Sequence, residues 1–260
     1  MKFLAENLWV RRLLSLLTLA VVWELLARLG ILDPFYAPPP SEVLRVVYSL
    51  FAQGRILSHL EATFTAAVAG LVIGVALGIF FGFAAALIPL VAELLEPVMM
   101  LLNAIPRVIL APLFVIWLGI ELPSKIALSV VLVAVLIFFA VYSGIKDVNQ
   151  LLVDRVRTLG GGRRILLREV YIPSVTAWVL GSLKVAVGFA FTGAVVGEFV
   201  AATRGLGYLL QFAQSTYNAS LTLGLIFLIM TFVLLLFVGA EAIEHRLLRW
   251  RYRGYNQQAS

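Results

Sequence analysis

Long apolar stretches are the feature that most constrains this chain. A helix needs about 20 mostly apolar residues to cross the hydrocarbon core of a bilayer. The chain is 62% hydrophobic and only 13% charged, which leaves too little polar surface for a soluble domain. We therefore expect an all-α membrane protein with six transmembrane helices. The six apolar stretches are roughly 13–32, 62–88, 98–119, 124–145, 174–198 and 221–244.

The first and third stretches differ from a simple span. The first follows basic residues, as the core of a secretory signal does, but it exceeds the usual length of about 7–15 residues and no A-x-A-like cleavage site follows it. We expect this helix to be retained. The third stretch contains Pro106 and Pro112, each of which removes a backbone hydrogen-bond donor, so a kinked helix is expected there.

Lysine and arginine positions orient the chain, because cytoplasmic segments of membrane proteins carry an excess of both. If the N-terminus is inside, the inner segments hold 13 of these residues and the outer segments hold four, with Arg28 near the outer end of the first span as a fifth. We therefore expect both termini to be cytoplasmic. The inner residues are Lys2, Arg11, Arg12, Lys146, Arg155, Arg157, Arg163, Arg164, Arg168, Arg246, Arg249, Arg251 and Arg253, and the outer ones are Arg45, Arg55, Lys125 and Arg204.

The expected spans divide the chain into three parts. Residues 1–61 hold the first transmembrane helix, a proline-rich segment and a short amphipathic helix for which Ser41 is the expected N-cap. This short helix would lie on the outer face, either as a surface helix without a partner or as a docking platform. Residues 62–245 form the transmembrane core, and residues 246–260 form a basic cytoplasmic tail. The apolar side of the short helix consists of Leu44, Val47, Leu50 and Phe51.

Small residues recur every four positions in two of the spans. Such a row lets a second helix approach closely, which gains van der Waals contact that bulkier side chains would block. For the second span we expect a partner helix within the same chain. The rows are Ala66, Gly70, Gly74, Gly78, Gly82 and Ala86 in the second span, and Ser182, Ala186, Ala190 and Ala194 in the fifth.

The loop between the fourth and fifth spans, at about 146–173, concentrates positive charge. The spacing of its apolar residues predicts a first helix that the glycines at 160–162 break, followed by a second short helix that ends near Pro173. Positive-inside bias and anionic lipid headgroups favour arginine here in any membrane protein. The apolar positions of the first helix are Val148, Leu151, Leu152, Val156 and Leu159, and those of the second are Ile165, Leu166 and Leu167.

The same loop carries a spaced motif. It resembles the cytoplasmic signature of the permease subunits of bacterial ABC importers, which reads E-A-A, three residues, G, nine residues, I-x-L-P. All gap lengths match, whereas neither alanine of E-A-A is present. Asp154, Arg155 and Val156 stand in the E-A-A positions, Gly160 in that of the glycine, and Val170, Ile172 and Pro173 in those of I-x-L-P.

Three further segments resemble one branch of these permeases, over roughly residues 35–250. They are P-P-P-S-E-V-L at 38–44, N-A-I-P-R-V-I-L-A-P-L-F-V-I-W-L-G at 103–119 and R-G-L-G-Y-L at 204–209. That branch carries nitrate, taurine, aliphatic sulfonates and bicarbonate, and its relatives carry pyrimidine precursors of thiamine and other aromatic compounds.

The resemblance implies a type I ABC importer transmembrane fold in the bacterial inner membrane, with 146–173 as the coupling loop. It implies a second copy of the chain, two ATPase subunits docked on that loop, and an extracytoplasmic solute-binding protein. ATP and Mg would bind to the ATPase, and this chain would need no cofactor, no metal and no nucleic acid. The sequence agrees in having no G-x-x-x-x-G-K-[ST] loop and no catalytic constellation. We expect the row from Ser182 to Ala194 to lie near the two-fold axis.

Charged residues within the spans are candidates for the substrate pathway. Arg107 and Lys184 each lie near mid-membrane, where a cation is costly unless it faces protein or water, and Glu198 lies near the outer end of its span. These positions favour a small organic or inorganic anion as the solute.

Two other interpretations remain open. In one, Arg107 binds carbonyls freed by Pro106 and Lys184 pairs inside the protein, so that neither contacts solute and an aromatic, pyrimidine-type compound is equally suitable. In the other, the chain is a secondary carrier, although such carriers usually hold several partnered ionisable groups in the membrane.

Overall fold

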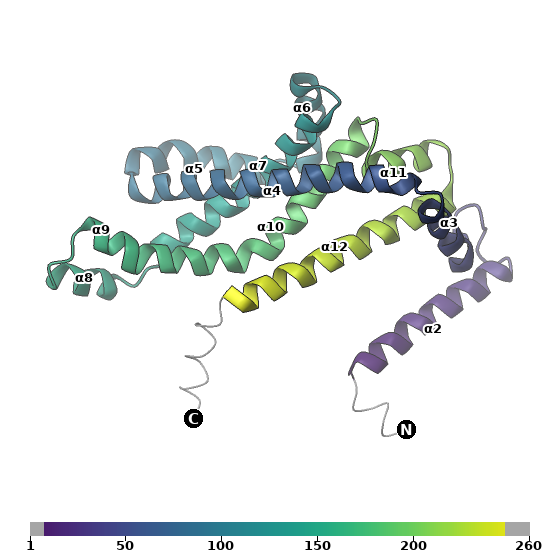
Figure 1. Cartoon of the computed structure of the whole chain (residues 1–260), viewed down its shortest axis with the longest axis horizontal. Coiled ribbons are helices and arrows are strands. Elements are labelled where there is room, and N and C mark those ends of the chain that lie inside the picture. The colour runs from purple at the N-terminus through teal and green to yellow at the C-terminus, as the bar shows by residue number, and fades with distance from the viewer. Residues whose placement is uncertain (1–7, 248–260) are drawn as a thin grey trace.

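A computed structural model describes residues 8–247, whose regular structure is helical throughout (Figure 1). Three short helices occupy the two ends of the molecule: α3 and α11 lie at one end, and α8 lies at the other with the still shorter α9. The long helices α4, α10 and α12 run lengthwise between these ends, whereas the short α6 projects at the top of the view and α2 lies on the side of α3. The elements are α2 (Leu8–Arg28), α3 (Pro40–Ala52), α4 (Arg55–Leu87), α5 (Pro89–Ala104), η1 (Arg107–Ile109), α6 (Leu110–Leu118), α7 (Leu122–Lys146), α8 (Gln150–Thr158), α9 (Arg163–Leu166), η2 (Leu167–Tyr171), α10 (Ile172–Val200), α11 (Leu206–Ser215) and α12 (Ala219–Leu247).

The glycine row of α4 packs against α7. A Cβ atom added to Gly74 would lie 2.7 Å from the Cβ of Val133, and one added to Gly78 would lie 2.7 Å from the Cβ of Ile137. Real Cβ atoms do not approach so closely, so only glycine permits this spacing of the two helix axes. Because the paired residue numbers rise together, α4 and α7 run parallel. The prediction of a partner helix within the same chain is confirmed.

The small-residue row of α10 also packs inside the subunit. Ala186, Ala190 and Ala194 are 0%, 2% and 0% exposed, among apolar side chains of α4 and α7. The hydroxyl of Ser129 on α7 donates to the carbonyl of Ala190 at 2.8 Å, which fixes the antiparallel α7–α10 pair. The prediction that this row lies at a two-fold axis is therefore wrong for its three alanines, because the subunit core already covers them. Ser182 is half-buried at the other end of the row.

Four described helical segments are long and apolar enough to cross a membrane: Arg55–Leu87, Leu122–Lys146, Arg163–Val200 and Ala219–Ala242. The first expected span corresponds to α2, which includes Arg11, Arg12 and Glu24. The third is split: α5 ends at Ala104, and α6 begins after the break at Pro106 and the single turn η1. The predicted kink is thus a full interruption. The count of six spans remains a prediction for these two stretches.

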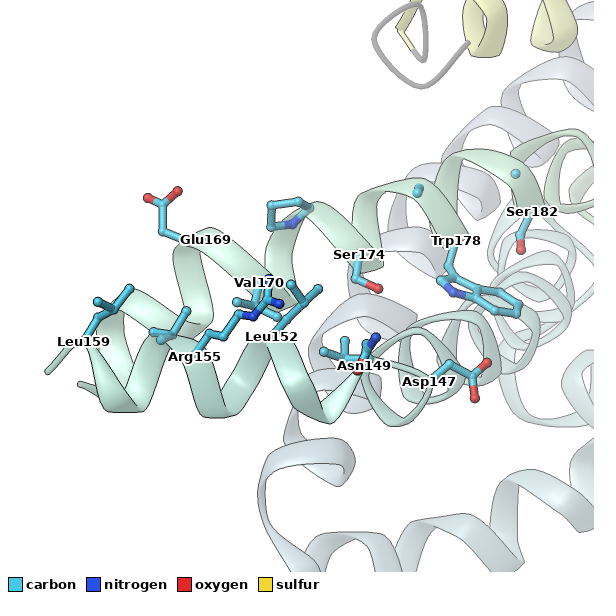
Figure 2. Close-up of a pocket in the computed structure, with 15 residues that line it drawn as sticks. Asp147, Asn149, Leu152, Arg155, Leu159, Glu169, Val170, Ser174, Trp178 and Ser182 are labelled. Carbon is cyan, nitrogen blue, oxygen red and sulfur yellow. The ribbon is translucent and has the colours of Figure 1, made fainter. Parts of the chain in front are cut away.

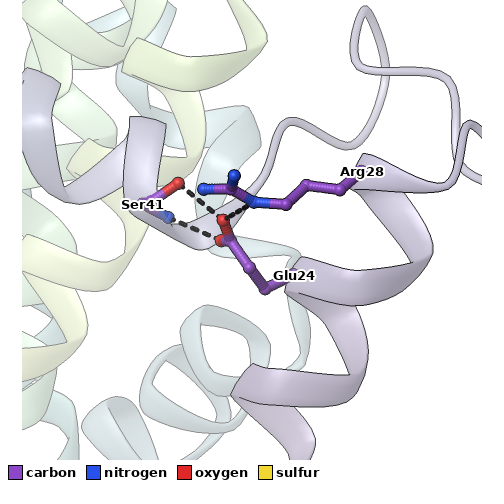
Figure 3. Close-up of polar contacts among 3 residues, drawn as sticks. All are labelled: Glu24, Arg28 and Ser41. Carbon is purple, nitrogen blue, oxygen red and sulfur yellow. Dashed lines mark hydrogen bonds and ion pairs between the residues drawn. The ribbon is translucent and has the colours of Figure 1, made fainter.

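A carboxylate of α2 holds the start of α3 (Figure 3). Glu24 accepts hydrogen bonds from the Ser41 amide at 3.0 Å, the Ser41 hydroxyl at 2.8 Å and the Arg28 guanidinium at 2.6 Å. The prediction that Ser41 is the N-cap of this helix is wrong: α3 begins at Pro40, so Ser41 lies inside the first turn and its hydroxyl is a donor. The orphan amide at the helix start is satisfied by Glu24 instead.

The other long helix at this end is α12, which packs against α3. The Ser220 hydroxyl donates to the Glu42 carboxylate at 2.5 Å, and Gly224 leaves room for Val47. The end of α2 and the start of α12 therefore meet at α3. Since both helices are continuous, the start of α2 and the end of α12 lie on the opposite side from α3. The predicted tail at 246–260 lies, from residue 248 onward, outside the described residues.

We predict that Gly78→Ala lowers the stability of the α4–α7 pair. Its Cβ would meet the Cβ of Ile137 at 2.7 Å and the carbonyl oxygen of Ala134 at 2.8 Å, and overpacking of this kind costs about 1–3 kcal/mol. Gly239→Ala on α12 is the matched control, because no heavy atom lies within 4 Å of an added Cβ there. Thermal unfolding of the purified variants should show a lower midpoint for Gly78→Ala alone. Equal midpoints would contradict the assigned contact.

Candidate functional site

The connection between α7 and α10 is a helix–turn–helix. The Asn149 side chain accepts a hydrogen bond from the Leu151 amide at 2.9 Å and thereby caps α8. After α8, Gly160 has a φ of +80°, the left-handed conformation that commonly ends a helix. The predicted helix and glycine turn are confirmed.

The second half of the connection differs from the prediction. No helix ends near Pro173; instead, α9, η2 and α10 form one continuous helical segment from Arg163 to Val200. Pro173 has no amide hydrogen to bond to the preceding turn, and its ring clashes with the carbonyl that such a bond would use. The wider π turn of η2, at Leu167–Tyr171, accommodates this defect without breaking the helix.

A small core holds the two halves of the connection together, and its outer surface is both apolar and basic. Val148, Val153 and Leu166 are buried, and Val156 and Val170 pack against them. Outside this core, large apolar side chains stand exposed beside the arginines, and such patches mark interaction surfaces. The exposed apolar side chains are Leu151 at 65%, Leu152 at 49%, Leu159 at 87% and Ile165 at 49%. Exposed arginines surround them: Arg155, Arg157, Arg163, Arg164 and Arg168.

A groove of about 880 Å³ separates α8 from the first turns of α10 (Figure 2). Trp178, Ser182 and Asp147 line one end of it, and Leu159 lies at the other. Of the motif residues, Arg155, Val156, Val170 and Pro173 line the groove, whereas Asp154 and Ile172 are exposed at the surface. The groove therefore connects the helix–turn–helix to the face of α10.

A second cavity, of about 420 Å³, lies at the break between α5 and α6. Ala104 and Pro106 from the break, Leu128 and Leu132 from α7, and Val196 from α10 form its apolar lining. Asn103 and Thr192 are the polar side chains among the described lining residues. Neither was identified from the sequence, because a neutral amide and a hydroxyl carry no distinct signal in an apolar stretch.

Of the three charged residues expected along the pathway, the two with described side chains, Lys184 and Glu198, do not line this cavity. Arg107 forms the start of η1, beside the break, and its side chain lies outside the described part of the structure. Lys184 pairs with Glu241 of α12, with its Nζ 3.0 Å from the carboxylate oxygen. This contact is the internal pairing that the sequence left open as an alternative.

Glu198 is 2% exposed and binds backbone and side chains around the start of α11. Its carboxylate accepts hydrogen bonds from the Thr63 hydroxyl at 2.8 Å and from the Gly207 amide at 2.9 Å. The Thr63 hydroxyl in turn accepts one from the Leu206 amide at 2.9 Å. These contacts satisfy amides that have no partner within the helix. Glu198 is thus the cap of α11.

The R-G-L-G-Y-L segment owes its glycines to this arrangement. Gly205 has a φ of +128°, and a side chain there would overlap the Glu198 carboxylate. A Cβ at Gly207 would meet the carbonyl oxygen of Val195. The Gly205 amide also donates to Nδ1 of His59 at 3.0 Å. Sequence reasoning missed the roles of His59 and Thr63, although their spacing of four residues places them on one face of α4.

We predict that Thr63→Val destabilises the attachment of α11 by about 1–3 kcal/mol, because it leaves the buried Glu198 carboxylate and the Leu206 amide each short of a partner. Thr231→Val is the matched control, since that exposed hydroxyl bonds only to the Phe227 carbonyl of its own helix. The thermal midpoint should fall for Thr63→Val and remain unchanged for Thr231→Val. A similar midpoint for both variants would disprove the capping role.

Comparison with known proteins identifies the family. Residues 74–249 match the family described as the binding-protein-dependent transport system inner membrane component. The chain belongs to this family. It is 32% identical over 245 residues to the taurine transport system permease protein TauC of Escherichia coli (strain K12), covering 91% of this chain and 89% of that protein. It is 31% identical over 238 residues to the formylaminopyrimidine transport permease protein ThiX of Halalkalibacterium halodurans, covering 92% of this chain and 94% of that protein.

The fold agrees with this assignment. The crystal structure of an amino acid ABC transporter with histidines is similar with a TM-score of 0.62 and 16% identity, over 78% of this chain and 96% of that one. The expected type I ABC importer fold is thereby confirmed. This member of the binding-protein-dependent permeases is a subunit of an ABC importer for a small solute, and it resides in the bacterial inner membrane. Among the side chains that the structure describes, no group of three or more histidines, aspartates or glutamates could hold a metal ion.

Proposed function

We propose that two copies of this chain form the translocation pathway of an ATP-driven importer and that α8 and α9 dock on two separate ATPase subunits. The observation that carries the proposal is the exposed apolar and basic surface of the helix–turn–helix, with Leu159 87% exposed. Both chain ends and this surface would be cytoplasmic, in accord with the excess of lysine and arginine there. An extracytoplasmic binding protein would deliver the solute at the end that carries α3 and α11.

The continuous helix through α9, η2 and α10 supports a mechanical role. Its first turns form part of the docking surface, and Thr192, further along the same helix, lines the cavity at the α5–α6 break. A displacement of the docked loop would therefore tilt or rotate the helix that lines the pathway. ATP binding and hydrolysis on the partner, with its bound Mg, would in this way bias the inward- and outward-facing states.

We predict that Gly160→Val uncouples transport from ATP hydrolysis. A β-branched residue is strained at a φ of +80°, so the turn would shift and displace α8 from the ATPase. Gly162→Val is the matched control, because Gly162 has a φ of −80° and no atom within 4 Å of an added Cβ. Solute-stimulated ATPase activity and co-purification of the ATPase should decrease for Gly160→Val only. Normal coupling in both variants would exclude a role for the turn.

The proposed solute is a small polar organic compound, with a sulfonate such as taurine as the first candidate. The similarity to the taurine permease supports this choice. The pairing of Lys184 with Glu241 argues against Lys184 as the group that binds the anion, so the proposed contacts are the neutral groups of Asn103 and Thr192. A formylaminopyrimidine-type compound is the second candidate, because the chain is nearly as similar to the permease that carries it.

We predict that Asn103→Leu reduces uptake about tenfold, which corresponds to the loss of one hydrogen bond of about 1.4 kcal/mol in the transport step. Uptake of labelled taurine into cells expressing the whole importer is the measurement, with unlabelled formylaminopyrimidine as competitor. Lys184→Gln serves as the comparison and should transport normally. A reversed result, with only Lys184→Gln impaired, would favour the charge-lined pathway. If taurine is not taken up, uptake of labelled formylaminopyrimidine by the same cells would favour the second candidate.

A further inference from the structure

The helix α3 has two apolar sides, of which the protein covers one. Val43 is buried, and Val43 and Val47 lie against Gly224 of α12. On the neighbouring side, Leu44, Tyr48 and Phe51 are 68%, 74% and 43% exposed. Their spacing of four and three residues places them in a single stripe along the helix. The described part of the chain thus leaves an apolar stripe of α3 without a partner.

The contacts of α3 place it close to the starts of α12 and α4. Gly224, which α3 contacts, is five residues beyond the first residue of α12, or about 8 Å along that helix. The span α4 begins at Arg55, directly after the turn that ends α3. An amphipathic helix in the interface buries its apolar side about 5–10 Å into the boundary between headgroups and acyl chains. If α12 enters the bilayer near its first residue, α3 lies at the level where such a helix resides.

The side chains around the stripe suit lipid better than protein. Arg45 is exposed and takes part in no ion pair among the described side chains, while the Glu42 carboxylate is bound to Ser220. Tyrosine is enriched at the level of headgroups, and the guanidinium of arginine forms charge-assisted hydrogen bonds with phosphate oxygens. Exposed apolar surface also continues into the adjoining spans, with Leu57 of α4 61% exposed and Phe227 of α12 44% exposed. The stripe is thus similar in composition to the exposed apolar surface of the two candidate spans α4 and α12.

We propose that α3 is an interfacial helix that inserts the Leu44–Tyr48–Phe51 stripe into the adjacent lipid leaflet and places Arg45 among the phosphate headgroups. The lipid surface is its partner, in place of a protein docked on that stripe. Because Glu24 binds the start of α3 and Ser220 binds Glu42, the helix would hold the ends of α2 and α12 at a fixed depth. The proposal holds for any solute that the importer carries.

Site-directed spin labelling tests the proposal directly, since the chain contains no cysteine to remove. Leu44→Cys and Tyr48→Cys place a label on the stripe. Ser49→Cys is the control, because Ser49 lies about 100° around the helix from Tyr48 and its hydroxyl bonds only to the Val46 carbonyl. Each labelled full-length protein is reconstituted into nanodiscs of phosphatidylethanolamine and phosphatidylglycerol. Accessibility to oxygen, which concentrates in lipid, is compared with accessibility to a water-soluble nickel chelate.

The expected result is that the labels at Leu44 and Tyr48 are accessible to oxygen and protected from the nickel chelate, at about 5–10 Å below the headgroups, while the Ser49 label is accessible to the chelate. Equal chelate accessibility at Tyr48 and Ser49 would overturn the proposal and leave the stripe in water. Protection of the Tyr48 label from both reagents would overturn it in favour of a protein partner. In that case, dipolar broadening that disappears on dilution with unlabelled protein would identify a second copy of this chain.

Discussion

The close approach of α4 to α7 is the constraint on which the rest of the structure depends. Lipid is as apolar as the helices themselves, so their association relies on van der Waals contact and on a few hydrogen bonds. Four glycines of α4, from Gly70 to Gly82, remove every side chain from the contact line. The resulting α4–α7 pair provides a continuous wall, against which the alanines of α10 pack. Cavities and surface loops are then arranged around this three-helix core.

Periodic features of the sequence predicted this core well. Rows at intervals of four are visible without any structure, and they identified both close-packed faces. They did not identify the partner of each face. A small residue permits close approach by any helix, so the row from Ser182 to Ala194 was compatible with either an internal or an intersubunit contact. Only the three-dimensional arrangement distinguishes an internal contact from an intersubunit contact. The helices that cover this row, α4 and α7, come from other parts of the chain, so the sequence of α10 does not identify them.

Polar features were harder to interpret from the sequence. A charge in an apolar stretch suggested a solute pathway for Lys184 and Glu198, yet both have partners from other helices. The partner of Glu198, Thr63, is 135 residues away in the chain and has no charge of its own. Thr63 also accepts from the Leu206 amide, 143 residues away in the chain, so its part in capping α11 could not be read from the sequence around that helix. The same holds at α3, where Glu24 of α2 takes the role expected of Ser41.

The sequence segments that resemble the permease family nevertheless coincide with positions where a helix begins or is interrupted. The segment at 38–44 contains the start of α3, that at 103–119 contains the break at Pro106, and that at 204–209 contains the capped start of α11. In each, helix termini expose amides or carbonyls that must find partners within an apolar environment. The choice of residue is thus most restricted at the ends of helices. This restriction explains why such short segments suffice to reveal the resemblance to the permease family.

The π turn of η2 changes the direction in which side chains of α9 point relative to those of α10. In a regular helix, the residue spacing alone would fix that relation. One residue corresponds to about 100° of rotation around an α-helix, so the extra residue of a π turn changes the azimuth of everything before it relative to everything after it. The side of α9 that faces outward is therefore set at Leu167–Tyr171, independently of the side of α10 that faces the cavity. An insertion or deletion confined to these five residues would therefore reorient the exposed loop while the buried face of α10 stayed unchanged.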